Sequence, residues 1–137
     1  MACDSTDCGF VDVKENTVVS TTNYGIAASS GHDISISKNR VVSSGLLPSG
    51  RRIKAQNVGI YIWNSDNDPG WGNVIGTGNM VGWVNADGRN DWYVPDATSF
   101  NGNHRLPSGT NLKNAEKGEH DIWQVKAQSN GVSVGNW

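Results

Sequence analysis

Three cationic residues lie close together in the middle of the chain, in a polar segment between two β-prone regions. Arg51, Arg52 and Lys54 come directly after the turn signal Pro48-Ser49-Gly50. A cationic cluster on a loop can bind the carboxylates of acidic sugars, because guanidinium and ammonium groups form charge-assisted hydrogen bonds. The same pattern is typical of a solvated loop. The cluster is therefore a candidate for an anion-binding or catalytic site.

Alternating aliphatic and aromatic residues follow at positions 58–63, where we expect a strand. Alternation places Ile60 and Ile62 on one face and Tyr61 and Trp63 on the other. If the isoleucines lie inside, the two aromatic rings stand on the outer face, where they suit stacking on sugar rings. Trp71 in the next loop is the third candidate for a ligand surface. Large side chains in this half of the chain could instead build a core.

The loop after this strand carries side-chain oxygens at alternating positions, as a calcium loop does. Asn64, Asp66 and Asp68 are the candidate ligands. The loop departs from the EF-hand pattern, since its glycine is displaced by one residue and Ile75 stands where the closing glutamate belongs. The same residue types form ordinary turns. A calcium site is a hypothesis beside that simpler interpretation, and we expect no other cofactor.

The two cysteines of the chain, Cys3 and Cys8, lie five residues apart. A disulfide between them would contribute roughly 2 kcal/mol in the chain-entropy model and would imply an oxidising compartment. Free thiols are the second possibility. A zinc site is the third, and it is disfavoured because no second pair of cysteines or histidines matches the first.

Length and charge exclude several classes of protein. The chain has 137 residues, which is one domain by length, and a formal net charge of −2. This charge argues against a nucleic-acid binder, whose surface would carry a basic patch. The sequence has no run of about 20 apolar residues that would span a membrane. The first residues have neither the basic start nor the apolar stretch of a signal peptide.

A repeated pattern organises the first 83 residues. Residues 11–20 have the form V-x-V-x-x-N-x-V-V-S, residues 34–43 have the form I-x-I-x-x-N-x-V-V-S, and residues 74–83 are a looser third copy. Asn16, Asn39 and Asn79 occupy the same place in each copy. Repeats of this kind stack and bury one another's apolar edges. Asparagine suits a shared corner, because it tolerates a left-handed backbone and its amide can bond the next copy.

These repeats resemble those of the right-handed parallel β-helix, the pectate-lyase-like superfamily, over residues 10–83. The resemblance implies an all-β solenoid of about three coils. The family includes polysaccharide lyases, hydrolases, epimerases and members without assigned activity, so fold alone does not give function. In its lyases the active residues project from one sheet and its flanking loops. That placement would let Lys54 or Arg52 abstract a proton from a uronate.

We expect one domain with three parts. Residues 1–9 lead in, residues 10–84 form the coils with Phe10 pointing inward, and residues 85–137 form an irregular capping extension with a last strand near residues 132–134. A helix is predicted at about residues 115–128, capped by Asn114. Its buried side would consist of Ala115, Ile122, Trp123 and Val125. We expect Trp123 and Trp83 to be structural.

The functional prediction is a non-catalytic module that is structural or binds a polysaccharide. Its uncapped end would pair with a second copy or continue a longer chain, because an open end exposes apolar rungs. A longer parent protein would favour an extracellular or periplasmic location. The alternative is a lyase-like enzyme acting on a uronate-containing glycan. Paired carboxylates at a recognisable spacing and a G-x-S-x-G elbow are both missing from the sequence.

Overall fold

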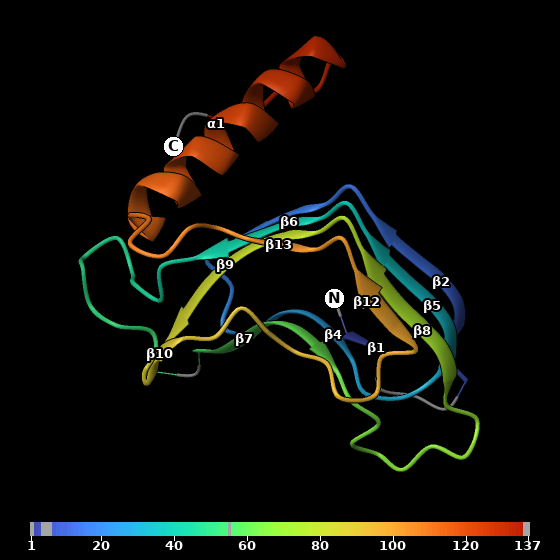
Figure 1. Ribbon diagram of the computed structural model, residues 1–137. Helices are drawn as coiled ribbons and strands as arrows, with labels where there is room; N and C mark the ends of the chain where they lie inside the picture. The colour runs from blue at the N-terminus through green and yellow to red at the C-terminus, as the bar shows by residue number, and fades with distance from the viewer. Residues whose placement is uncertain (1, 4–6, 55, 136–137) are drawn as a thin grey trace.

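The computed structural model describes residues 2–3, 7–54 and 56–135, and it is mostly β with one helix in those ranges (Figure 1). The elements are β1 (Ala2–Cys3), β2 (Gly9–Lys14), β3 (Thr17–Val19), β4 (Asn23–Ala28), β5 (His32–Ser37), β6 (Arg40–Ser43), β7 (Gln56–Ile62), β8 (Gly72–Thr77), β9 (Met80–Asn85), β10 (Gly88–Arg89), β11 (Trp92–Tyr93), β12 (Ser99–Asn101), β13 (His104–Arg105) and α1 (Leu112–Ser129). Within the described ranges, no helix has the length and apolar character that a membrane crossing requires.

The strands form three sheets, and the chain visits the sheets in rotation. The first sheet has the order β1-β4-β7-β11, the second β12-β8-β5-β2, and the third β10-β9-β6-β3, with β13 also paired to β9. Among the described strands, every pairing is parallel except that of β10 with β9. Figure 1 shows the three sheets around a common interior, with α1 outside them. The predicted mostly β architecture with parallel strands is confirmed.

The strand register matches the repeat alignment read from the sequence. Ile34 of β5 lies between Val11 of β2 and Val74 of β8. In the next sheet, Val41 of β6 lies between Val18 of β3 and Val81 of β9. Equivalent β-branched residues therefore stack directly on one another, which brings like shapes into contact within the interior.

The interior is filled by aliphatic side chains from all three sheets and by one tryptophan. Its buried members are Val13, Ile26, Ala28, Ile34, Ile36, Val41, Ile60, Ile62, Val74, Val81 and Trp83. The predicted structural role of Trp83 is confirmed, since its side chain is fully buried. Phe10 does not point inward: its side chain is 83% exposed, and its left-handed backbone (φ 55°) turns it out of the sheet.

An asparagine ladder holds the corner between the second and third sheets. Asn39 Oδ1 accepts hydrogen bonds from the backbone N–H and the amide of Asn16, both at 3.0 Å. Asn79 Oδ1 accepts the same pair from Asn39 at 2.9 Å, and Asn103 Oδ1 accepts the pair from Asn79 at 3.0 and 2.8 Å. The ladder was predicted for three asparagines, and Asn103 extends it by a fourth.

The left-handed position at this corner is the residue before each asparagine. Glu15, Lys38, Gly78 and Gly102 all have φ between 54° and 67°. A left-handed backbone at these four places turns the chain from one sheet to the next and aims the following amide along the stack. The prediction assigned this conformation to the asparagines themselves, and the structure corrects it by one residue.

The segment after Trp83 is not irregular, contrary to the prediction for the extension that begins at residue 85. β11 pairs with β7, β12 with β8 and β13 with β9, all in parallel. Trp92, Val94, Ala97 and Phe100 pack against the interior from this segment. The three strands thus add one strand to each of the three sheets and cover one end of the core.

Helix α1 begins three residues earlier than predicted. Its N-cap is Asn111, whose side chain accepts a hydrogen bond from the backbone N–H of Asn114, the residue predicted to be the cap. The helix runs back along the third sheet and contacts β6 and β3. No strand is present at the expected residues 132–134, and Val132 is 52% exposed.

The buried side of α1 also differs from the prediction. Ile122 and Val125 are 56% and 67% exposed, and Trp123 is 39% exposed. The buried residues are instead Leu112, Glu116, Glu119 and Ala127. The two glutamates can be buried because hydrogen bonds from serine and arginine partners satisfy their oxygens.

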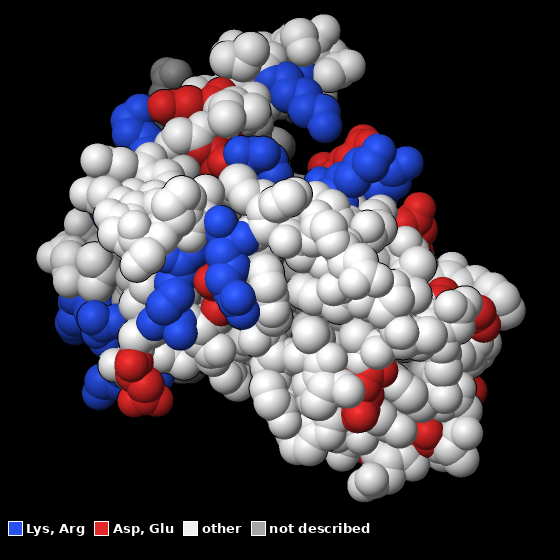
Figure 2. Space-filling model, viewed as in Figure 1, with Lys and Arg blue, Asp and Glu red and all other residues white. Residues whose placement is uncertain are grey.

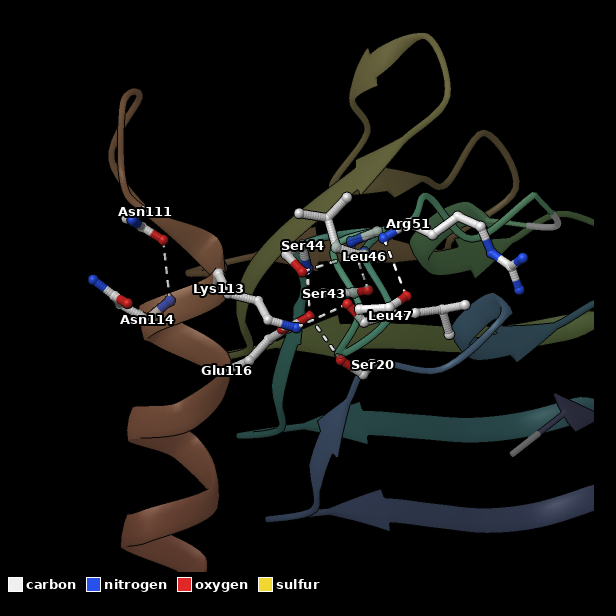
Figure 3. Close-up of polar contacts among 12 residues, drawn as sticks. Ser20, Ser43, Ser44, Leu46, Leu47, Arg51, Asn111, Lys113, Asn114 and Glu116 are labelled. Carbon is white, nitrogen blue, oxygen red and sulfur yellow. Dashed lines mark hydrogen bonds and ion pairs between the residues drawn. The ribbon is translucent and has the colours of Figure 1, made fainter.

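Both buried glutamates of α1 bond to residues far away in the sequence. Glu116 accepts hydrogen bonds from the Ser20 hydroxyl at 2.7 Å and from the backbone N–H of Ser44 (Figure 3). Glu119 pairs with the guanidinium of Arg40 through two hydrogen bonds, the longer at 2.6 Å. These hydrogen bonds, which Arg40 donates to the Glu119 carboxylate, raise the pKa of Arg40. Polar pairing, rather than an apolar stripe, attaches the helix to the third sheet.

The cysteine prediction falls partly outside the described residues. Cys8 is disulfide-bonded, and no free cysteine is present in the part of the chain that the structure describes. The side chain of Cys3 lies outside the described residues. A free thiol at Cys8, one of the three possibilities left open, does not occur.

Candidate functional site

Four aromatic rings gather on the outer surface of the first sheet. They come from three neighbouring strands: Tyr24 from β4, Tyr61 from β7 with Trp63 just after it, and Tyr93 from β11. We call these four residues the aromatic face. Tyr61 and Trp63 were predicted from the alternation of β7, whereas Tyr24 and Tyr93 were not.

Strand register explains why these rings meet. Tyr61 lies between Ala27 of β4 and Tyr93 of β11, so Tyr61 and Tyr93 are neighbours across the sheet. On either side of Tyr61, Ile60 and Ile62 are fully buried in the core, which confirms the predicted alternation.

Tyr24 reaches the outer surface through an irregularity in its strand. The register between β4 and β7 shifts between Asn23 and Tyr24, and Asn23 has a left-handed backbone (φ 68°). The shift turns the Tyr24 side chain outward, where it packs with Ala27, Val58 and Tyr61 in an apolar cluster of its own.

The rings contact one another in edge and tilted geometries. The centroids of Tyr61 and Trp63 are 6.0 Å apart, those of Tyr61 and Tyr93 6.1 Å, and those of Trp63 and Tyr93 5.7 Å. Tyr24 lies 4.8 Å from Tyr61. Such distances are within the favourable range for aromatic pairs, so each ring holds the next in place.

The rings of the aromatic face differ in exposure: one is buried at its base and two are exposed. Tyr61 is only 8% exposed, whereas Trp63 and Tyr93 are 42% and 47% exposed. The planes of these two exposed rings are nearly perpendicular, at 88°. Large exposed aromatic side chains that are fixed by neighbours mark a binding surface, because they offer apolar area without losing much flexibility on binding.

Trp71 does not belong to the aromatic face. Its indole N–H donates to the carbonyl oxygen of Asp96 at 3.1 Å, and its ring packs against the core. Trp71 is half-buried and fixes the path of the loop between β7 and β8. Of the three predicted ligand-binding residues, the structure therefore brings Tyr61 and Trp63 together and places Trp71 elsewhere.

The oxygens proposed for calcium mostly have partners within the protein. Asp68 is 5% exposed and accepts hydrogen bonds from the backbone N–H groups of Gly31 and Gly70 and from the Ser30 hydroxyl. The N–H donors of Gly31 and Gly70, with the Ser30 hydroxyl, lower the pKa of Asp68. The Asn64 side-chain oxygen accepts from the Asp68 N–H at 2.8 Å.

These hydrogen bonds leave Asp66 as the exposed member of the predicted calcium ligands. Among the described residues, no group of three or more histidine, cysteine, aspartate or glutamate side chains is arranged to hold a metal ion. Asn64 and Asp68 shape a turn, as the alternative interpretation of the sequence has it.

The cationic cluster lines a hollow of its own. Arg51, Arg52 and Lys54 surround it together with Leu47, Ile53 and Thr22, and its volume is about 550 Å³. Arg52 donates a hydrogen bond to the Asn85 carbonyl oxygen at 3.1 Å. Within the described ranges, none of the three cations forms an ion pair.

The cationic hollow lies beside the starting ends of the strands that carry the aromatic face. Thr22 lines the hollow and stands two residues before Tyr24, and Gln56, two residues after Lys54, is paired with Asn23. A long polymer bound across the first sheet could therefore reach both features, whereas a single sugar ring could not.

A histidine–aspartate pair lies on the outside of the second sheet. His32 Nδ1 and Asp33 Oδ2 are 2.8 Å apart, and the Asn73 amide donates to Asp33 at 2.6 Å. The hydrogen bonds from Asn73 and then from His32 lower the pKa of Asp33. The edge of the Phe10 ring meets the His32 ring at a centroid distance of 5.2 Å. The contacts hold the ring of His32 in one orientation.

In comparisons with protein-family models, curated proteins and solved structures, nothing matches this chain.

Proposed function

We propose that this chain is a non-catalytic module of the right-handed parallel β-helix type that binds carbohydrate on its aromatic face. The β-helix assignment is supported by the rotation of the chain through three sheets and by the parallel register of equivalent residues. The asparagine ladder supports it further, because a side-chain ladder along one corner needs coils of matching shape.

The observation that carries the binding function is the aromatic face itself. Trp63 and Tyr93 present two exposed rings at 88° to each other above the buried ring of Tyr61. The faces of sugar rings carry C–H groups that stack on aromatic rings, and the hydroxyl groups at the rim stay in water. The members of this face are stacking rings with no carboxylate among them, which suits retention of a glycan rather than cleavage.

The alternative is a lyase-like activity on a uronate-containing glycan. It is favoured by the cationic hollow, where Arg51, Arg52 and Lys54 have no carboxylate partner within the described part of the chain. An anionic sugar would supply the missing negative charge. Both functions use a polysaccharide, and only turnover separates them.

The test is affinity electrophoresis of the purified protein in gels that contain neutral or acidic polysaccharides. We expect retention by at least one polysaccharide, and about tenfold weaker retention for Trp63→Ala and Tyr93→Ala. Trp123→Ala is the matched control, since Trp123 is 39% exposed and lies on α1 rather than on the aromatic face. Its retention should equal that of the unmodified protein.

The same panel is incubated with the protein in solution while ultraviolet absorbance reports unsaturated uronates and a reducing-end assay reports cleavage. Turnover that is lost in Lys54→Ala or Arg52→Ala would overturn the non-catalytic proposal. Equal loss of retention in Trp63→Ala and Trp123→Ala would overturn the assignment of the aromatic face.

A further inference from the structure

A second hollow, separate from the aromatic face, lies where the last turn of strands meets the start of α1. Its volume is about 580 Å³. The apolar part of its wall consists of Leu46, Val84, Leu106 and Leu112. This volume is in the range of small-molecule sites, which are typically about 300–1,000 Å³ and mostly apolar with a few polar groups. We call it the terminal hollow.

Close packing fixes the wall of the terminal hollow. A Cβ at Gly82 would stand 2.7 Å from Leu106 Cδ1 and 2.8 Å from Leu112 Cδ2, so both leucines rest directly on the backbone of β9. Leu112 is 6% exposed. The apolar surface is therefore formed before any ligand arrives, which reduces the entropy lost on binding.

Two arginines at the hollow share one buried carboxylate. Asp91 is 4% exposed, and its oxygens face Arg89 Nε at 2.6 Å and Arg105 Nε at 3.3 Å. The backbone N–H of Trp83 donates to the same carboxylate at 2.8 Å. One negative charge therefore faces two positive charges. The Asp91 carboxylate balances the charge of only one of the two arginines.

The arginines are held so that part of each guanidinium stays available. Arg89 Nη2 donates to the Leu106 carbonyl oxygen at 2.8 Å, which fixes its plane. Arg105 lies over the Trp92 ring at 4.1 Å, and its side chain is 59% exposed. In the described residues, the two terminal nitrogens of Arg105 make no hydrogen bond.

A third cation completes the rim. Lys113 lines the hollow from the first turn of α1, where no acidic side chain is present. Its Nζ is 3.8 Å from the Glu116 carboxylate and 3.4 Å from the Leu47 carbonyl oxygen (Figure 3). Figure 2 shows lysine and arginine side chains gathered around a smaller acidic area on this side of the molecule.

We propose that the terminal hollow binds a small organic anion with an apolar body and a carboxylate head. The apolar body contacts the leucine wall, and the head group pairs with the free guanidinium nitrogens of Arg105 beside Arg89 and Lys113. The bound carboxylate supplies a second negative charge, so that the two arginines face two carboxylates instead of Asp91 alone. This inference does not depend on carbohydrate binding, since the two sites share no residue.

The experiment compares two probes of equal chain length, octanoate and octan-1-ol, by titration of methyl NMR spectra. We expect octanoate to shift the methyl signals of Leu46, Val84, Leu106 and Leu112, and to bind at least about tenfold more tightly than octan-1-ol. Raising the salt concentration should weaken octanoate binding and leave octan-1-ol binding unchanged.

Two variants with a matched control locate the head group. Arg105→Gln should weaken octanoate binding about tenfold, and Lys113→Gln should weaken it severalfold. Lys117→Gln, one helical turn further along α1 and outside the hollow, should leave octanoate binding unchanged. Because Lys113 is exposed on the helix, its variant tests the inference even if Arg105→Gln loosens the contact with Trp92.

Any of four results would overturn the inference: equal affinity for the two probes, octanoate shifts confined to methyl groups elsewhere, equal weakening by Lys113→Gln and Lys117→Gln, or absence of octanoate binding at millimolar concentration.

Discussion

The asparagine ladder gives a quantitative prediction about stability. Asn79 is fully buried, and its amide bonds four groups: the N–H and amide of Asn39, the Ile36 carbonyl oxygen and Asn103 Oδ1. Asn79→Ala would leave the buried backbone N–H of Asn39 without its partner, at about 1–3 kcal/mol, and would remove the side-chain hydrogen bond to the Ile36 carbonyl oxygen, at about 1 kcal/mol. We therefore expect a loss of about 2–4 kcal/mol of unfolding free energy.

Asn16→Ala is the matched control at the end of the same ladder. Asn16 is exposed, its side chain makes one hydrogen bond to Asn39 Oδ1, and its backbone N–H keeps the other bond to that oxygen. We expect its removal to cost about 1 kcal/mol or less.

The assay is equilibrium unfolding in urea, followed by circular dichroism, for the unmodified protein and both variants. The unfolding free energies of the two variants should differ by at least about 1 kcal/mol, with the same slope of free energy against urea concentration. Equal losses of unfolding free energy in Asn79→Ala and Asn16→Ala would refute the reasoning. Burial would then not determine how much a hydrogen bond of the ladder stabilises the fold.

Three further predictions concern pH, the helix and assembly. Because the folded pKa of Asp68 lies below its unfolded value near 3.9, its carboxylate stabilises the fold above about pH 4, and this contribution disappears as the pH falls through the folded pKa. The unfolding free energy measured in urea between pH 3 and pH 6 should depend less on pH for Asp68→Asn than for the unmodified protein. Glu119→Gln should lower the melting temperature by about 4 °C, because its partner Arg40 is partly solvated and the pair contributes about 1 kcal/mol. Sedimentation equilibrium should show self-association through the edge strands β2 and β3, and a proline at Val18 of β3 should abolish it.

The strands that could be predicted are those whose residues favour β structure on their own. β5, β6 and the long strand β7 carry Val and Ile residues between turn residues, and the repeated asparagine aligned the copies that contain β5 and β6. β11 and β13 have two residues each and form because β7 and β9 offer unpaired edges, which no local pattern reveals. Tyr93 of the aromatic face was missed for this reason.

For the helix, the sequence pattern predicted the element but not the face that it buries. Its existence followed from capping residues and helix formers, but the apolar stripe of Ile122, Trp123 and Val125 indicated the wrong face. The buried face is set by Arg40, Ser20 and Ser44, which lie 72 to 96 residues away from their glutamate partners. Such pairing is tertiary, so a helical period cannot predict it.

Trp71 illustrates the same limit for the site. A tryptophan in a loop after an aromatic strand predicted a ligand surface, but the path of the loop brings its indole N–H to the Asp96 carbonyl oxygen. Where alternation within one strand sufficed, as for Tyr61 and Trp63, the sequence placed the rings on the correct face.

The most direct test of carbohydrate binding on the aromatic face is a two-dimensional ¹H–¹⁵N NMR titration of the tryptophan indole signals with the polysaccharide that the gel panel retains. We expect the Trp63 signal to shift on binding, because this indole is exposed beside Tyr61 and Tyr93. The signals of buried Trp83 and of Trp123 on α1 should stay in place. A shift of Trp123 without a shift of Trp63, or retention with all of these signals unmoved, would contradict binding on this face.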